Sequence, residues 1–183
     1  PFPTRTEHTM TDKYDPLFQL QGEKLGIDCR FFKAMAYVES SFNALAKSRC
    51  GALGLMQIMP ATAKDCGIAI GVLLYNPLIN VAIGTTYLVD QYRQISEIKS
   101  HNERLKVALA AYNGGLGYVL KAIRIFERSH GYTPTCWNDV KVGLQSPDCL
   151  VRGEDPECGQ IFAYVEKVWK TYQAYLTQEG ART

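Results

Sequence analysis

The alternation of apolar and polar residues along this chain predicts a series of amphipathic helices. Apolar residues recur at spacings of three and four over most of the sequence, which places them on one face of an α-helix. Prolines, glycines and capping residues at the ends of these runs mark where each helix begins and ends. We expect helices at about 14–25, 29–40, 60–66, 77–95, 103–112, 116–130 and 160–176.

The helix ends carry recognisable signals. Asp28 is expected to be the N-cap of the second helix, and Asn76 followed by Pro77 is a typical helix start. Asn102 is expected to cap the helix that follows. Gly84 lies inside the 77–95 helix, where glycine costs about 1 kcal/mol relative to alanine. We therefore expect another backbone to approach Gly84 closely.

Two segments depart from the helical pattern. Glycines interrupt 51–59 (GALGLMQIM), so this segment is expected to form a turn with short extended pieces. Residues 133–158 contain three prolines, three cysteines and little periodicity, and we expect an irregular, disulfide-stapled insertion. The predicted fold class is α+β and predominantly α, with a minor extended element.

The length suits one domain. With 183 residues, we expect a loose lead-in at 1–12, a single domain at 13–178 and a tail at 179–183. Hydrophobic residues make up 46% and charged residues 21%, which is typical of a globular protein with a real core.

Charge and hydropathy exclude two classes of partner. A net charge of +2 is too small to indicate nucleic-acid binding. No window approaches the roughly 18 unbroken apolar residues of a membrane span, so we expect no integral membrane segment. The chain opens at Pro1 without an initiator methionine or a signal-peptide pattern, and we expect a mature or trimmed form.

Six cysteines with wide spacing predict a disulfide framework in an oxidising compartment. Three precede Gly67 and three follow Thr135, so full pairing requires at least one bridge between the halves. The alternative is six reduced, buried thiols in a cytosolic protein. There is no CxxC pair and there are three histidines, so we expect no metal site.

Glu39 is the most conspicuous polar residue in an apolar setting. It shares one helix face with Phe32, Met35 and Ala36. Burial in such surroundings should raise the pKa of the carboxyl group, as a general acid requires. The alternative is that the helix simply ends here and the carboxylate faces solvent.

Four blocks in order, with a weaker fifth, resemble the catalytic domain of soluble lytic transglycosylases. They are ESSFN at 39–43, AKSRCGALGLMQIMPATA at 46–63, NPLINVAIGTTYL at 76–88, ALAAYNGGLGYV at 108–119 and the weaker AYVEKV at 163–168. This family is glycoside hydrolase family 23, which is also similar to goose-type lysozyme. Any one block is a weak signal, and their shared order makes the resemblance specific.

The resemblance implies a lysozyme-like fold with a groove for the glycan strands of peptidoglycan. It implies that Glu39 is the catalytic acid/base, with no cofactor and no metal. Such an enzyme protonates the oxygen between N-acetylmuramic acid and N-acetylglucosamine. The same carboxylate then takes a proton from the muramyl 6-hydroxyl, which closes a 1,6-anhydro ring without water.

The distribution of acids agrees with a single catalytic carboxylate. Ordinary glycosidases place two carboxylates across the scissile bond. Between Glu39 and Asp65 the chain has no aspartate or glutamate, which favours a reaction assisted by the substrate's own groups. A distant acid such as Asp90 or Glu127 folding into the groove would supply the second carboxylate instead.

The resemblance also implies substrate-binding residues, which are Ser48, Gln57, Met59, Tyr112, Asn113 and Tyr164. Three of them have a structural alternative: Ser48 would be a turn residue, while Met59 and Tyr112 would be core. Gly51, Gly54 and Gly114 are expected to satisfy backbone requirements. Gln160 occupies a position where the family often has glutamate, which leaves the role of Tyr164 less defined.

We therefore expect a peptidoglycan lytic transglycosylase acting in the periplasm or outside the cell. Its partners would be glycan strands, with a cell-envelope machine or a phage particle as a further partner. One rival is hydrolysis by a goose-type lysozyme, which would leave reducing ends instead of anhydro ends. The other is a non-catalytic glycan-binding component of a virion or secretion machine, for which Glu39 would be dispensable.

Overall fold

The computed structural model describes residues 13–68, 71–149 and 158–180, so the predicted lead-in at 1–12 and residues 181–183 of the tail lie outside it. The chain divides into two compact units. The first is Pro1–Thr86 with Lys170–Thr183, and the second is Tyr87–Trp169.

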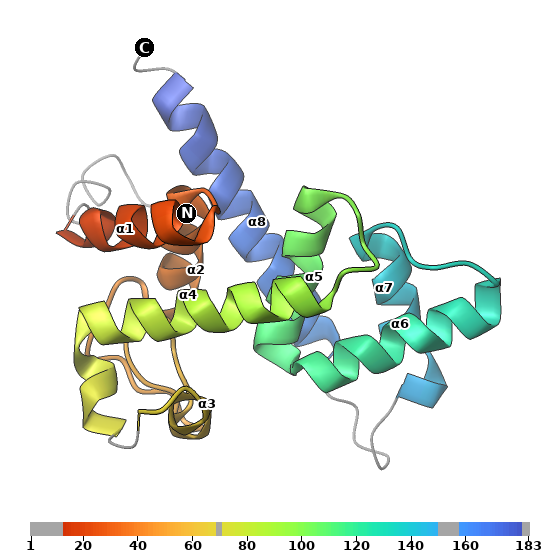
Figure 1. The fold of residues 1–183 in the computed structure, drawn as a ribbon, viewed down its shortest axis with the longest axis horizontal. Coiled ribbons are helices and arrows are strands. Elements are labelled where there is room, and N and C mark those ends of the chain that lie inside the picture. Colours follow the sequence, from red (N-terminus) through yellow and green to blue (C-terminus); the bar gives the residue numbers. More distant parts are fainter. Residues whose placement is uncertain (1–12, 69–70, 150–157, 181–183) are drawn as a thin grey trace. The chain divides into compact units, whose positions relative to one another are not determined.

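The first unit packs helices around a phenylalanine-rich core. Its elements are α1 (Asp15–Leu25), α2 (Cys29–Ser40), α3 (Pro60–Asp65), the 3-10 helix η2 (Gly71–Tyr75), the first part of α4 (Pro77–Gln94) and the last part of α8 (Cys158–Gly180) (Figure 1). Phe18, Phe31 and Phe32 are buried at its centre. Phe31 meets the Tyr172 ring of α8 edge-on, with 5.4 Å between ring centroids, so α8 is anchored to α2.

The second unit is a helical cluster. It contains the remainder of α4, then α5 (His101–Gly114), α6 (Leu116–His130), α7 (Trp137–Leu144), the 3-10 helix η3 (Pro147–Cys149) and the first part of α8 (Figure 1). The three helices α5, α6 and α7 pack against one another. Leu105 and Leu109 of α5 and Phe126 of α6 are buried in this unit.

The predicted helices are confirmed, although α5 and α8 are longer at both ends than predicted. Asp28 caps α2, accepting a hydrogen bond from the Arg30 amide at 2.9 Å, and Asn76 accepts from the Leu78 amide at 3.0 Å. Helix α5 begins at His101 with Ser100 as N-cap, so the prediction that Asn102 is the cap was wrong. The Ser100 backbone carbonyl accepts from Arg104 N–H at 2.9 Å, and the first turn therefore forms two residues earlier than expected.

The predicted extended element around 51–59 is confirmed as isolated β-bridges. Leu53 pairs with both Lys47 and Ile58 in antiparallel fashion. No longer strand forms among the described residues. The first unit is thus helical with a small bridged turn region, in agreement with a predominantly α fold.

The prediction of an irregular excursion at 133–158 was wrong for much of that range. Helix α7 and η3 lie within it, while 150–157 are outside the described residues. The buried faces of Trp137, Val140 and Leu144 repeat at helical spacing. A Cβ atom on Gly143 would lie 2.2 Å from the Ala122 carbonyl oxygen, so α7 packs directly onto the backbone of α6.

The predicted disulfide framework was also wrong. No disulfide joins the six cysteines, all of which lie in the described part of the chain. Cys136 instead serves as the N-cap of α7 in a capping box with Asp139. The Cys158 thiol donates to the Leu144 carbonyl at 3.3 Å and lies 3.0 Å from the Tyr118 hydroxyl. The thiols of Cys136 and Cys158 form local hydrogen bonds, not disulfide bonds.

None of the described helices combines the length and the apolar character needed to cross a bilayer.

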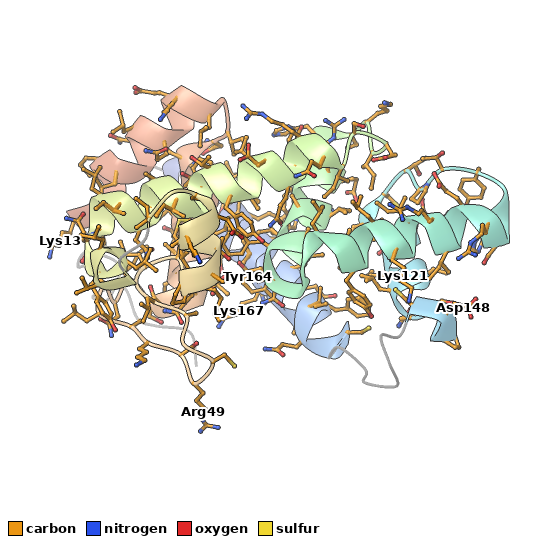
Figure 2. All side chains as sticks on the ribbon, turned by 60° about the horizontal axis from the view of Figure 1, so that its bottom comes forward. Lys13, Arg49, Lys121, Asp148, Tyr164 and Lys167 are labelled. Carbon is orange, nitrogen blue, oxygen red and sulfur yellow. The ribbon has the colours of Figure 1, made fainter. Side chains whose placement is uncertain are left out.

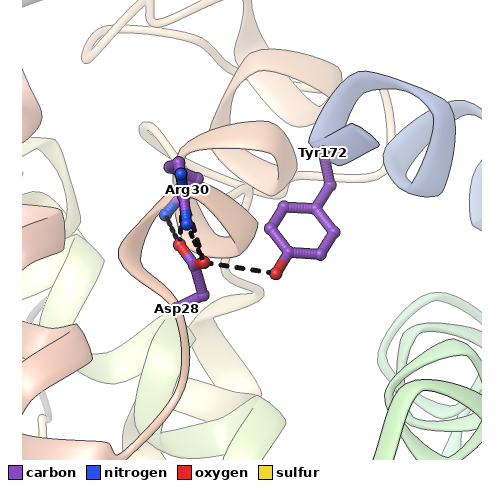
Figure 3. A network of polar contacts seen from close by, with 3 residues as sticks. All are labelled: Asp28, Arg30 and Tyr172. Atoms are coloured by element: carbon purple, nitrogen blue, oxygen red, sulfur yellow. Dashed lines mark hydrogen bonds and ion pairs between the residues drawn. The ribbon is translucent and has the colours of Figure 1, made fainter. Parts of the chain in front are cut away.

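A polar network at the start of α2 connects it to α8 (Figure 3). Arg30 donates to Asp28 from Nη2 at 2.6 Å and from Nε at 2.9 Å. Tyr172 donates its hydroxyl to the same carboxylate at 3.3 Å. The hydrogen bonds from Arg30 lower the pKa of Asp28 below its ordinary value of 3.8, and burial opposes that effect.

Replacing Asp28 by asparagine should reveal this ion pair through the pH dependence of stability. Because the folded pKa is depressed, the stabilisation is complete above the unfolded pKa and is lost as the pH falls through the folded pKa. Asparagine keeps a capping oxygen, so we expect a loss on the order of 1 kcal/mol at about pH 7. That loss should shrink towards zero near about pH 2. Urea unfolding of both proteins across this range measures it, and a difference that does not change with pH would contradict the assignment.

Candidate active site

Glu39 lies in the last turn of α2, one residue before the helix ends. Its side chain is half-buried, so it neither sits deep in the core nor turns fully to solvent. No basic residue lies in that last turn. Glu39 therefore lies at a helix end that carries partial negative charge.

Ser40 connects this helix end to the loop that follows. Its hydroxyl lies 2.8 Å from the Leu55 carbonyl oxygen and 3.1 Å from the Ala36 carbonyl oxygen. The first contact spans fifteen residues and joins α2 to the GLMQ segment, residues 54–57. The residue beside Glu39 is therefore attached directly to that segment.

The GLMQ segment forms a tight turn closed by Leu53 and Ile58. These two residues exchange backbone hydrogen bonds of 3.0 Å in each direction, and Gln57 N–H donates to the Gly54 carbonyl at 3.2 Å. Gln57 has a φ of 47°, a left-handed conformation that is uncommon outside glycine. Strain of this kind often accompanies functional sites.

Asn80 of α4 holds the turn from its other side. Its Oδ1 accepts from Met56 N–H at 2.7 Å, and its Nδ2 donates to the carbonyls of Leu53 and Leu74, both at 2.9 Å. The side chain is completely buried. Three buried backbone groups of this region are thus satisfied by one amide.

Two glycines allow this close packing. A Cβ on Gly54, where φ is 77°, would lie 2.3 Å from both Asn80 Nδ2 and the Leu74 carbonyl oxygen. A Cβ on Gly84 would lie 2.7 Å from the Met56 sulfur. The close approach predicted at Gly84 is therefore present, and the group that approaches is a side chain, not a backbone.

The side-chain amide of Gln57 uses its nitrogen for hydrogen bonds within the protein and leaves its oxygen available. Its Nε2 donates to the Gly54 carbonyl at 2.9 Å and to the Ala46 carbonyl at 3.4 Å. Within the described chain, Oε1 has no hydrogen-bond partner. The side chain is half-buried, so Gln57 can accept a hydrogen bond from a bound molecule and has little capacity to donate one.

The structure agrees with the structural alternative for Ser48 and contradicts the one for Met59. The Ser48 hydroxyl accepts from Ala52 N–H at 2.9 Å and so closes the 48–52 turn. This is the turn role that was the alternative for Ser48, although its own proton remains available for donation. Arg49 extends outward from this turn (Figure 2). Met59 is 40% exposed, so the alternative that it is a core residue was wrong.

Tyr112, Asn113 and Tyr164 belong to the second unit. Tyr112 is half-buried near the end of α5, where its ring lies 5.6 Å from that of Tyr87, and Asn113 is exposed. A Cβ on Gly114 would lie 2.4 Å from Ile161 Cδ1, so the end of α5 packs against the start of α8. Tyr164 follows on α8 and is 8% exposed (Figure 2).

The structure thus gathers the predicted residues into two groups, one in each unit. Glu39, Ser48, Gln57 and Met59 lie on connected segments of the first unit, and the two tyrosines with Asn113 lie where α5 meets α8 in the second. The contacts of Ser40 and Asn80 were not anticipated. A polar residue on the apolar side of the 77–95 helix was the available signal for Asn80.

No group of potential metal ligands occurs in the described ranges of either unit. A hollow of about 280 Å³ between α6 and α7 and another of about 580 Å³ over the charged face of α6 are lined by other residues. Neither includes a predicted site residue.

The model of the family described as Transglycosylase SLT domain matches residues 16–133. Among curated proteins, a membrane-bound lytic murein transglycosylase F of Alcanivorax borkumensis is 33% identical over 175 residues, covering 92% of this chain and 36% of that protein. The protein of the same name from Aliivibrio fischeri is 34% identical over 172 residues, covering 91% and 34%. The chain therefore spans about a third of the length of these relatives.

Solved structures show the same fold. An inactive mutant of the lytic transglycosylase Slt of Pseudomonas aeruginosa superposes with a TM-score of 0.68 at 23% identity, over 93% of this chain and 25% of that one. The 70 kDa soluble lytic transglycosylase of Escherichia coli gives 0.59 at 27% identity, over 90% and 24%. The predominantly helical fold expected from the sequence resemblance is confirmed.

Proposed function

Because this chain belongs to the family of the transglycosylase SLT domain, we propose that it is a peptidoglycan lytic transglycosylase. It cleaves the β-1,4 bond between N-acetylmuramic acid and N-acetylglucosamine and leaves 1,6-anhydro ends. Its similarity to lytic murein transglycosylases F supports this reaction. The substrate is the glycan strand, and no cofactor takes part.

One observation carries the proposal. Glu39 is a half-buried acid at a helix C-terminus, and its neighbour Ser40 is bonded to the strained turn that contains Gln57. A general acid must be protonated and held in place. The negative end of the helix favours the protonated form, and the hydrogen bond from Ser40 to the turn favours a fixed position. Two other acids of this unit have charged partners, since Asp28 pairs with Arg30 and Asp15 pairs with Lys33.

The reaction uses one carboxyl group in two steps. Glu39 first donates its proton to the bridging oxygen as the bond from the muramyl C1 to that oxygen breaks. The Glu39 carboxylate then accepts the proton of the muramyl 6-hydroxyl as that oxygen bonds to C1. No water is consumed, so the products together have the mass of the substrate. The raised pKa predicted for Glu39 is part of this proposal.

The remaining site residues are assigned to substrate binding. Gln57 would accept a hydrogen bond through Oε1, and Ser48 would donate through its hydroxyl proton. Met59, Tyr112, Asn113 and Tyr164 complete the proposed set, with exposed Met59 offering an apolar contact. An aromatic ring with a polar hydroxyl, as in Tyr112, suits a sugar surface.

We propose a periplasmic or extracellular location for this chain. The relatives are named as murein transglycosylases, and murein lies in the cell envelope, which supports that location. The cysteines no longer support it, since no disulfide is found among them; it rests on the substrate. A partner in an envelope machine or a phage particle stays a prediction.

The products of digestion test the proposed reaction. We expect purified sacculi treated with the protein to release muropeptides ending in 1,6-anhydromuramic acid, each lighter by one water than a reducing muropeptide. Mass spectrometry of the soluble products distinguishes the two. A hydrolytic muramidase run in parallel supplies the reducing products as a control. Reducing ends from this protein would identify a lysozyme instead.

A further inference from the structure

We propose that Ser40 is a positioning residue that sets the place of Glu39 relative to Gln57. The role of Ser40 rests on the proposed function, in which Glu39 is the catalytic acid, and adds Ser40 to the residues that support that reaction. The contacts that matter are those of a single peptide group, the one between Leu55 and Met56.

This peptide group is held at both ends. Its carbonyl oxygen accepts from Ser40 Oγ at 2.8 Å, and its N–H donates to Asn80 Oδ1 at 2.7 Å. Because a peptide group is planar and rigid, fixing both atoms fixes the orientation of the whole unit. It is therefore clamped between α2 and α4. Gln57 follows one residue later, and Glu39 precedes Ser40 directly.

The geometry favours Leu55 as the main acceptor of the Ser40 proton. A hydroxyl has one hydrogen to donate, and the Leu55 oxygen is closer than the Ala36 oxygen, at 2.8 Å against 3.1 Å. Leu55 is fully buried, and elsewhere in the described chain its carbonyl has no hydrogen-bond partner. Losing the hydroxyl would leave a buried acceptor unsatisfied.

The consequence for catalysis is geometric. Misplacing a catalytic group by about 1 Å can cost about 10²-fold in rate. Without the Ser40 hydroxyl, the end of α2 and the 53–58 turn are free to separate, and the distance from the Glu39 carboxyl to the substrate oxygen is no longer fixed. The substrate itself still meets Gln57 and the other binding residues.

Replacing Ser40 by alanine tests this arrangement. We expect kcat on solubilised glycan strands to fall by about 10- to 100-fold, with KM within about twofold of the parent value. The acid and base limbs of the kcat–pH profile should shift, because they report the Glu39 carboxyl. A structural loss that merely reduced the folded fraction would lower the apparent kcat without moving the profile.

Two further variants sharpen the comparison. Ser40→Thr keeps a hydroxyl and should restore most of kcat. Ser129→Ala is the matched control, since the Ser129 hydroxyl donates to the carbonyl four residues earlier, at 3.0 Å, and makes no hydrogen bond to another described element. It should leave kcat unchanged. Full activity in Ser40→Ala, or equal losses in the alanine and threonine variants, would overturn the inference.

A second measurement does not depend on turnover. Hydrogen exchange of the Met56 amide should accelerate by at least about tenfold in Ser40→Ala, while amides of α6 keep their rates. If the parent protein released no anhydro products, the proposed function would fail and the exchange rates would decide this inference alone. An unchanged Met56 rate would show that Ser40 does not hold the turn.

Discussion

Replacing Glu39 by glutamine should lower glycan turnover by about 10³-fold or more. General acid–base catalysis contributes about 10²- to 10⁴-fold per group, and here one carboxyl is assigned both proton transfers. Glutamine has nearly the same shape but cannot donate an acidic proton or accept one as a carboxylate. Release of soluble muropeptides from sacculi over time measures the loss.

The fold should survive this change. Glu39 is half-buried in the last turn of α2, so a neutral isostere creates neither a cavity nor a buried charge, and we expect an unfolding midpoint close to that of the parent. Glu23→Gln is a suitable control, because Glu23 is an exposed residue of α1 in the same unit. It should be as active as the parent. Wall lysis by Glu39→Gln at the parent rate would remove the assignment. If the parent itself caused no lysis, the non-catalytic glycan-binding alternative would be favoured.

Replacing Gly54 by alanine should cause a large loss of stability in the first unit. The left-handed φ of 77° costs an alanine about 1–2 kcal/mol. Its Cβ would also lie 2.3 Å from the Leu74 carbonyl oxygen and from Asn80 Nδ2, and overpacking costs about 1–3 kcal/mol. We expect a total of about 3 kcal/mol in urea unfolding, with activity lost as the turn is displaced.

Gly67 separates the two contributions. It has a φ of 84°, but no atom lies within 4 Å of its ideal Cβ position. Gly67→Ala should therefore show only the conformational cost of about 1 kcal/mol. Equal losses at the two positions would mean that the contact with Asn80 and Leu74 contributes nothing.

Much of the helical framework could be predicted from the sequence because its signals are local. Asp28, Gly26 and the Asn76–Pro77 pair act within one turn of their own helix, and their effects do not depend on the rest of the chain. The shifted start of α5 shows the limit of such signals. Ser100 caps with its backbone carbonyl and makes no side-chain capping bond, so side-chain preference pointed to Asn102.

The misjudged segment at 133–158 has a related cause. Prolines and cysteines suggested an irregular, cross-linked loop, but α7 is stabilised by packing on α6 and by the bond from Trp137 N–H to Glu103 at 2.9 Å. Glu103 lies 34 residues earlier. Helix α7 has only 8 residues, so its helical spacing covers about two turns, and the contacts with Glu103 and α6 that stabilise it cannot be read from its own sequence.

The candidate acid itself was evident from sequence. Glu39 stands at the end of an apolar stripe, and the ordered blocks around it identified the family, because motif order and spacing are properties of the chain alone. The protonation of Glu39, its partners in substrate binding and its product remain predictions, which muropeptide masses and the Glu39→Gln variant test.

The support of Glu39 became visible only in three dimensions. Ser40 contacts Leu55, which lies 15 residues later. Asn80 contacts Met56 and Leu53, which lie 24 and 27 residues earlier. No local pattern encodes which carbonyl a serine will contact. That choice depends on how α2, the 53–58 turn and α4 pack around the small volume of Gly54. Local signals along the chain therefore specify the helices and the acid, whereas long-range packing specifies what holds the acid in place.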